Sequence, residues 1–112
     1  MFTFAVREAR DFIIVALNGE LDLSTSGGLL EHLVSRSDTT TVVDLVELSF
    51  MDSSGISTLV RARNRLAESG GRLVLTRPHE NVYRTLEIVG LADWVSEWNP
   101  EWSKDSKDLS RG

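Results

Sequence analysis

Apolar and polar residues alternate in patterns that predict strands in the first part of the chain. Phe2, Phe4 and Val6 are separated by polar or small residues, which is typical of a half-buried edge strand. The continuous apolar run 12–17 is typical of a central strand that is buried on both faces. We expect the link 8–11 to join these two strands as an antiparallel hairpin.

The spacing of apolar residues becomes helical after Gly19, which we interpret as a bulge or bend in the second strand and not as a hairpin turn. The leucines and the valine within 29–34 form the apolar stripe of a first helix, for which Ser24 or Thr25 is the expected cap. The glycines at 27–28 each weaken a first turn by up to about 1 kcal/mol relative to alanine. We therefore expect this helix to fray or to begin late.

Strands and helices alternate in the rest of the chain. The segments 41–46 and 72–76 are rich in β-branched and apolar residues, which predicts two strands. The apolar period between them predicts a helix from about Ser54 to Ser69, which the glycines at 70–71 end.

Pro78 lies near the start of a third predicted helix, which carries Val82, Leu86 and Val89 and ends at Gly90. A last short strand is expected within 94–98. This order of elements indicates a single α/β domain over residues 1–98, with a mixed, mostly parallel sheet that is covered by helices. We expect the polar segment 99–112 to be a flexible tail.

Composition narrows the range of functions. The 112 residues contain no cysteine, which excludes disulfides and thiolate chemistry, and the net charge of −5 argues against nonspecific nucleic-acid binding. No apolar run is long enough to span a membrane, and the first residues lack the features of a secretory signal, so we expect a cytoplasmic protein. His32 and His79 are not in a metal-ligand spacing, so we expect no metal and no cofactor.

The segment 50–56 carries the most distinctive chemistry, because it places a carboxylate and two hydroxyls where a strand is followed by a helix. Asp52, Ser53 or Ser54 can accept hydrogen bonds from the free N–H groups of the first helical turn. The positive end of the helix dipole also favours a carboxylate or a phosphate there. A serine at this position is either a helix cap or the acceptor of a chemical modification.

Several short motifs, in this order, resemble the STAS domain of bacterial anti-sigma-factor antagonists over about residues 1–98. The fairly specific element is Asp-Ser-Ser-Gly at 52–55. The others are Gly-Glu-Leu-Asp at 19–22, Val-Asp-Leu at 43–45, Gly-Gly at 70–71 and Gly-Leu at 90–91.

The resemblance implies a regulatory protein that switches between partners. An antagonist of this family binds an anti-sigma factor that is also a serine kinase, and the sigma factor is thereby released. The kinase phosphorylates the serine that follows the aspartate, here Ser53, and the phosphorylated antagonist dissociates until a serine phosphatase resets it. The chain lacks nucleotide-phosphate and kinase motifs, so we expect it to be a substrate and not an enzyme.

Several residues around Ser53 are expected to contact the partner, each with a purely structural alternative. Asp22 follows the Gly-Glu-Leu element and is equally well explained as a loop residue before a helix. Ser54 is the competing acceptor and a possible cap, while Asp52 and Gly55 complete the turn. Two basic residues, Arg61 and Arg65, extend this surface along the helix or simply form a solvated face.

Two other hypotheses stay open. The chain is alternatively a STAS subunit of another signalling or transporter-associated complex, in which the turn at 52–55 serves as a docking surface without a phosphorylation switch. A hydrolase that uses Ser53 with a histidine base is the third hypothesis, although no Gly-x-Ser-x-Gly motif is present.

Overall fold

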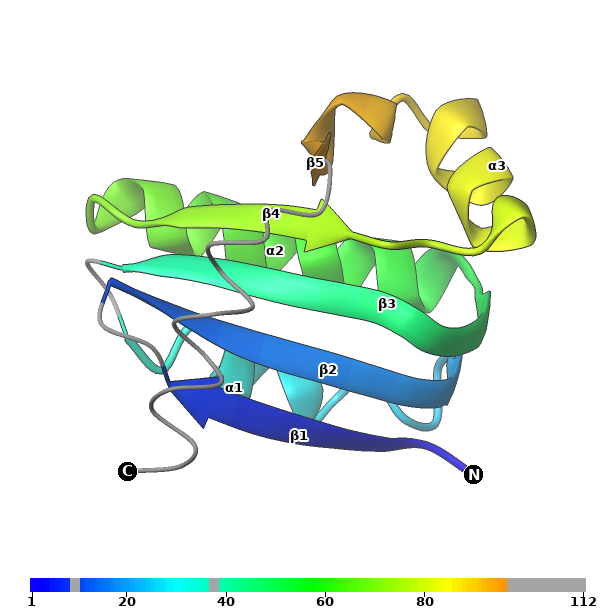
Figure 1. Ribbon diagram of the computed structural model, residues 1–112, viewed down its shortest axis with the longest axis horizontal. Helices are drawn as coiled ribbons and strands as arrows, with labels where there is room; N and C mark the ends of the chain where they lie inside the picture. The colour runs from blue at the N-terminus through cyan, green and yellow to red at the C-terminus, as the bar shows by residue number, and fades with distance from the viewer. Residues whose placement is uncertain (9–10, 37–38, 97–112) are drawn as a thin grey trace.

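The computed structural model describes residues 1–8, 11–36 and 39–96. A five-stranded sheet with the order β1-β2-β3-β4-β5 forms the centre of the domain, and its helices are α1, α2 and α3 (Figure 1). The strands are β1 (Thr3–Glu8), β2 (Phe12–Leu21), β3 (Thr40–Met51), β4 (Arg72–Thr76) and β5 (Val95–Ser96). The helices are α1 (Leu29–Leu33), α2 (Ser53–Glu68) and α3 (Glu80–Ile88), with a 3-10 turn η1 (Ala92–Trp94) before β5.

The sheet is mixed and mostly parallel, as predicted. β1 pairs with β2 in the antiparallel sense, and each later strand is parallel to its neighbour. This confirms the hairpin and the α/β class. Val6 is 47% exposed, so β1 is more exposed than its alternation of apolar residues predicted.

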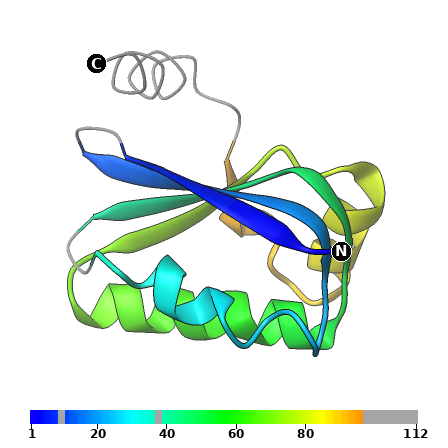
Figure 2. The same cartoon turned by 90° about the horizontal axis from the view of Figure 1, so that it is seen from below.

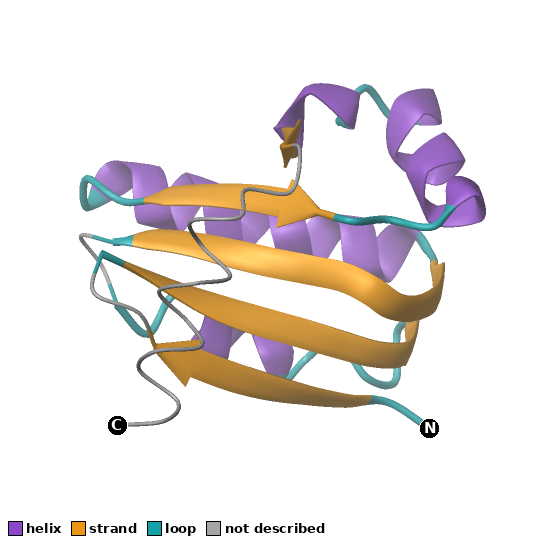
Figure 3. Ribbon diagram, viewed as in Figure 1, coloured by secondary structure: helices purple, strands orange, loops and turns teal. Residues whose placement is uncertain are grey.

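Both faces of β2 are buried, as its continuous apolar run predicted. Ile13, Val15 and Leu17 belong to the main core, which lies between the sheet and the helices, whereas Phe12 and Ile14 belong to a second cluster on the opposite face. Figure 2 shows α1 and α2 together on one side of the sheet, and Figure 3 shows the same layers by type of element. Within the described residues, no helix is long and apolar enough to cross a membrane.

β2 and β3 extend further than the sequence predicted. The pairing shifts register between Ala16 and Asn18 and again after Gly19, so the interpretation of Gly19 as a bulge is confirmed. Gly19 has φ +101°, and a Cβ there would collide with the backbone carbonyl of Met1, so glycine is required. Beyond this bulge the strands continue to pair until Leu21 lies opposite Met51.

The first helix begins late, as its two glycines suggested, but the predicted cap is wrong. α1 begins only at Leu29, and its cap position is Gly28, which has no side chain to accept a hydrogen bond. Ser24 and Thr25 instead donate hydrogen bonds within the loop to Asp22, which lies too far before α1 for them to cap it.

The ends of the other helices agree closely with the predictions. Gly70 and Gly90 adopt positive φ values just after α2 and α3, where they end the two helices. Val89 is 46% exposed and so does not belong to the buried stripe of α3. The predicted domain boundary at residue 98 and the predicted tail lie outside the described residues.

Candidate functional site

The predicted site lies where the carboxyl ends of β2 and β3 meet. Leu21 and Met51 are paired in the sheet, and the backbone N–H of Asp52 donates a hydrogen bond to the carbonyl of Leu21 at 3.2 Å. Asp22 therefore begins its loop beside the residue that precedes α2. Two segments that are thirty residues apart in the sequence form one surface.

Asp52 is the cap of α2. Its Oδ1 accepts hydrogen bonds from the backbone N–H groups of Ser54 at 2.9 Å and of Gly55 at 3.2 Å. Asp52 has an extended backbone, with φ −103° and ψ −170°, as a cap residue requires. Of the three residues that the sequence left open as the cap, Asp52 is therefore confirmed, whereas Ser53 and Ser54 already lie inside the helix.

Ser53 is the first residue of α2, and its side chain is exposed. Within the described part of the chain, its hydroxyl makes no hydrogen bond. Ser54 is only half-buried, and its carbonyl accepts a hydrogen bond from the Thr58 hydroxyl at 3.0 Å. The capping is complete without either hydroxyl, and Ser53 is the more accessible of the two.

Gly55 lets the start of α2 approach the sheet closely. A Cβ at this position would lie 2.7 Å from Cγ of Met51 and 2.9 Å from Cγ of Leu21, and both distances are shorter than real Cβ contacts. Gly55 is buried, so its observed role is to pack α2 against the ends of β2 and β3. A direct contact between Gly55 and a partner stays a prediction.

Asp22 organises the loop that follows β2. Its Oδ1 accepts hydrogen bonds from the Ser24 backbone N–H at 3.0 Å, the Ser24 hydroxyl at 2.8 Å and the Thr25 hydroxyl at 3.2 Å. The hydrogen bond from the Ser24 side chain is the main reason that the pKa of Asp22 lies below its usual value. The structural interpretation of Asp22 is thus supported by its contacts, while a contact with a partner stays a prediction.

The loop and the helix enclose a shallow pocket of about 340 Å³, which we call the Ser53 pocket. Its lining consists of Leu23, Ser26, Ser53, Ser54, Ser57, Thr58 and Arg61. Arg61 is exposed and has no ion pair with any described residue, so its guanidinium is available. Arg65 is exposed one turn further along α2 and is not among the lining residues.

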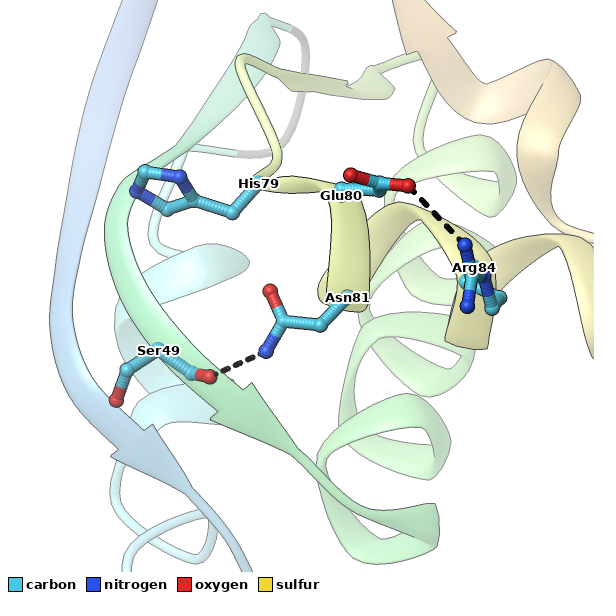
Figure 4. Close-up of a pocket in the computed structure, with 5 residues that line it drawn as sticks. All are labelled: Ser49, His79, Glu80, Asn81 and Arg84. Carbon is cyan, nitrogen blue, oxygen red and sulfur yellow. Dashed lines mark hydrogen bonds and ion pairs between the residues drawn. The ribbon is translucent and has the colours of Figure 1, made fainter.

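A larger pocket of about 600 Å³ lies at the start of α3 and is lined by Ser49, His79, Glu80, Asn81 and Arg84 (Figure 4). Its polar groups are paired with one another or with the backbone. Asn81 Nδ2 donates to the Ser49 carbonyl at 2.8 Å, and Arg84 forms an ion pair with Glu80 at 3.1 Å. The Asn81 hydrogen bond holds α3 against β3, whereas the Arg84–Glu80 pair lies within α3. None of the residues predicted for the site lines this pocket.

The geometry gives the hydrolase hypothesis no support. His79 is exposed, and its Nε2 donates a hydrogen bond to the carbonyl of Val46 at 2.6 Å. His32 packs edge-on against Phe4, with 4.8 Å between the ring centroids. Neither histidine is among the described residues that line the Ser53 pocket, so no histidine base is placed beside the hydroxyl.

Sequence reasoning missed two features. Leu23 lines the Ser53 pocket and is 79% exposed, a fact that only the shape of the loop reveals. Asp44 and Arg77 form a bidentate pair, with Nε–Oδ1 at 3.1 Å and NH2–Oδ2 at 2.6 Å, across thirty-three residues of sequence. The only signal for this pair was the Val-Asp-Leu element, in which a charged residue interrupts a buried strand.

Known proteins resemble this chain in sequence and in fold. The anti-sigma-B factor antagonist of Listeria monocytogenes is 32% identical over 94 residues, which are 81% of this chain and 82% of that protein. The structure of the anti-sigma factor antagonist SpoIIAA in its unphosphorylated form superposes with a TM-score of 0.78 at 26% identity, over 92% of this chain and 94% of that one. The Bacillus cell fate determinant SpoIIAA in its phosphorylated form gives a TM-score of 0.72 at 25% identity, over 92% and 97% of the two chains.

The model of the STAS domain family matches residues 3–106, which is nearly the whole chain. The match confirms the resemblance that the motifs at 19–22, 43–45 and 52–55 suggested. This chain belongs to the STAS domain family.

Proposed function

We propose that this chain is an anti-sigma-factor antagonist that switches partners through phosphorylation of Ser53. In its unmodified form it binds a serine-kinase anti-sigma factor in the cytoplasm, phosphorylation releases it, and a serine phosphatase restores the binding form. The observation that carries the proposal is the exposed, unbonded hydroxyl of Ser53 beside a cap that Asp52 completes alone. The names of the relatives support the role of antagonist.

The fold should tolerate a phosphate on Ser53. The hydroxyl makes no hydrogen bond to a described residue, so its modification breaks no contact that holds α2 in place. A phosphate at the first residue of a helix also lies near the positive end of the helix dipole. Phosphorylation is therefore expected to change the surface of the domain and not its folding.

A phosphate on Ser53 should oppose a docked partner. It adds about −1.5 to −2 charges at pH 7 beside the Asp52 carboxylate. The N–H groups of Ser54 and Gly55 are already engaged by Asp52, so they are not free to neutralise the second anion. A partner that packs against a neutral hydroxyl would have to bury this charge, which costs binding free energy.

The chemistry of the switch is divided between the two proteins. Oγ of Ser53 attacks the γ-phosphorus of ATP, the bond to ADP breaks, and a base of the kinase takes the hydroxyl proton. The kinase supplies Mg²⁺ and the cations that stabilise the transferred group. This chain supplies the acceptor, which the short turn between β3 and α2 presents to solvent.

Four of the other predicted residues lie around this acceptor or extend its surface along α2. Asp52 and Ser54 flank it, Arg61 shares its pocket, and Arg65 continues the exposed face of α2. We propose that both arginines face acidic groups of the partner, because neither has an ion pair among the described residues. A chain with a net charge of −5 would otherwise repel an acidic surface.

The test uses purified serine-kinase anti-sigma factors from the organism that encodes this chain. Intact-mass measurement after incubation with Mg-ATP should show one added phosphate on the wild type and on Ser54→Ala, and none on Ser53→Ala. In calorimetry, Ser53→Ala should bind the kinase and Ser53→Asp should bind poorly. Equal binding by the two Ser53 variants would reject the switch and favour docking in another assembly.

A further inference from the structure

The loop after β2 places a large apolar side chain in solvent next to the proposed acceptor. Leu23 is 79% exposed, although burying a leucine is one of the larger gains available to a protein surface. It lines the same pocket as Ser53 and Arg61. Single exposed leucines are common on protein surfaces, but this one is continuous with the surface that binds the kinase in the function proposed above.

The same loop is held in one shape by a local hydrogen-bond network. Besides the bonds that Asp22 Oδ1 accepts from Ser24 and Thr25, the backbone N–H of Asp22 donates to the Thr25 hydroxyl at 2.9 Å. The N–H groups of Thr25 and Ser26 both donate to the Asp22 carbonyl, at 3.1 and 2.9 Å. Leu23 lies between these anchored residues, so its backbone is fixed while its side chain stays exposed.

A rigid loop with one apolar side chain is suited to binding, because little conformational entropy is lost when a partner covers it. Residues that dominate binding free energy are anchors of this kind, which fill a pocket of the partner and are surrounded by polar contacts. Arg61 lines the helix side of the Ser53 pocket, where its exposed guanidinium is placed to make such a polar contact.

We propose that Leu23 is the apolar anchor by which this chain binds its kinase, and that Asp22 is the positioning residue that holds Leu23 in place. The inference rests on the proposed function and adds the chemistry of the partner. The kinase presents an apolar pocket of leucine size, with an acidic group facing Arg61. Asp22 acts through the shape of the loop and makes no ionic contact of its own with the partner.

The test measures dissociation constants by calorimetry for the kinase that phosphorylates Ser53. Leu23→Ala should weaken binding by about 10- to 100-fold, because a buried leucine side chain is lost. Ile88→Ala is the matched control, since Ile88 is also 79% exposed but lies on α3 and is not part of the Ser53 pocket. It should bind within about twofold of the wild type.

The role of Asp22 is tested by two further comparisons. Asp22→Ala should weaken binding, and the double variant with Leu23→Ala should be no weaker than Leu23→Ala alone, because both changes remove the same anchor. Asp22→Asn should restore binding, since its amide oxygen can accept the bonds from Ser24 and Thr25. Additive losses, or an Asn variant as weak as the Ala variant, would show a direct ionic contact and overturn this role. Thermal unfolding of each variant checks that the domain is folded.

The two proposals fail in different ways. Suppose that Leu23→Ala binds the kinase as tightly as the wild type while Ser53→Asp binds poorly. The role of Leu23 as the anchor is then refuted, and the proposed switch at Ser53 stands. If Ser53→Asp binds as tightly as Ser53→Ala, the switch is refuted, whatever the result at Leu23.

Discussion

The backbone N–H of Asp52 donates a hydrogen bond to the carbonyl of Leu21 at 3.2 Å, and this bond continues the pairing of Leu21 with Met51. It places the end of β2 beside the start of α2. The loop that begins at Asp22 and the helix that begins at Ser53 therefore form one surface. The proposed switch depends on this junction, because the phosphate and the apolar anchor must meet the same partner.

The cap of α2 should contribute measurably to stability. Asp52→Ala removes the acceptor for the N–H groups of Ser54 and Gly55 and should lower the free energy of unfolding by about 1 kcal/mol. Asp52→Ser keeps a cap oxygen, so its free energy of unfolding should fall by less than that of Asp52→Ala. Urea denaturation of both variants measures the difference, and an Ala variant as stable as the wild type would show that Asp52 does not act as the cap.

The close approach of α2 to the sheet should not tolerate a larger residue at position 55. Gly55→Ala places a methyl group 2.7 Å from Cγ of Met51 and should destabilise the domain by about 1 to 3 kcal/mol. Gly27→Ala is the control, because the added Cβ there would meet no atom within 4 Å beyond Gly27 and its two neighbours in the chain. Thermal denaturation should show a lower Tm for the first variant only; equal Tm values would contradict the packing described for Gly55.

The Asp44–Arg77 pair should contribute more to the free energy of unfolding than the exposed Arg84–Glu80 pair on α3. The Asp44 side chain is only 8% exposed, so Arg77→Ala leaves a nearly buried carboxylate without its bidentate partner. Because the Arg77 side chain is 40% exposed, we expect a loss of about 1 to 3 kcal/mol, less than for a fully buried pair. Arg84→Ala, which breaks the exposed pair with Glu80, should cost at most about 0.5 kcal/mol. Denaturant unfolding that ranks these two variants in the opposite order would refute this assignment.

The carboxyl group of Asp22 should titrate below its ordinary pKa of 3.8, chiefly because the Ser24 hydroxyl donates to its charged form. A lowered pKa in the folded state means that the contribution of these bonds to stability is fully present above pH 3.8. It is lost as the pH falls through the lower, folded-state pKa. NMR titration of the Asp22 carboxyl group should show a pKa below 3.8, and Ser24→Ala should raise this pKa. A Ser24→Ala variant with an unchanged pKa would contradict the network.

The order of elements could be predicted because continuous apolar runs indicate buried strands and glycines indicate where helices end. The run at 12–17 and the segment 72–76 are short and rich in apolar residues, and both form buried strands. The start of α2 was predicted to within one residue. Its cap could not be assigned, because 52–54 contains three consecutive residues that can all cap a helix, and only the backbone angles distinguish them.

Contacts between distant residues could not be predicted from local patterns. The pairing of β2 with β3 beyond Gly19 depends on two register shifts, and the Asp44–Arg77 pair depends on how β4 is placed beside β3. The first helix was given a wrong cap because the carboxylate of Asp22 competes for Ser24 and Thr25. Leu23 lies in the loop that these hydrogen bonds shape, so its exposure could not be predicted from the sequence either.

The most direct test of the switch compares one protein in two chemical states. The chain is phosphorylated fully on Ser53, freed of kinase, and its dissociation constant for that kinase is measured beside that of the unmodified chain at equal salt. Because the phosphate adds charge next to Asp52, we predict binding at least about tenfold weaker, and recovery after treatment with a serine phosphatase. Equal affinity of the two states would contradict the proposal that Ser53 is the switch.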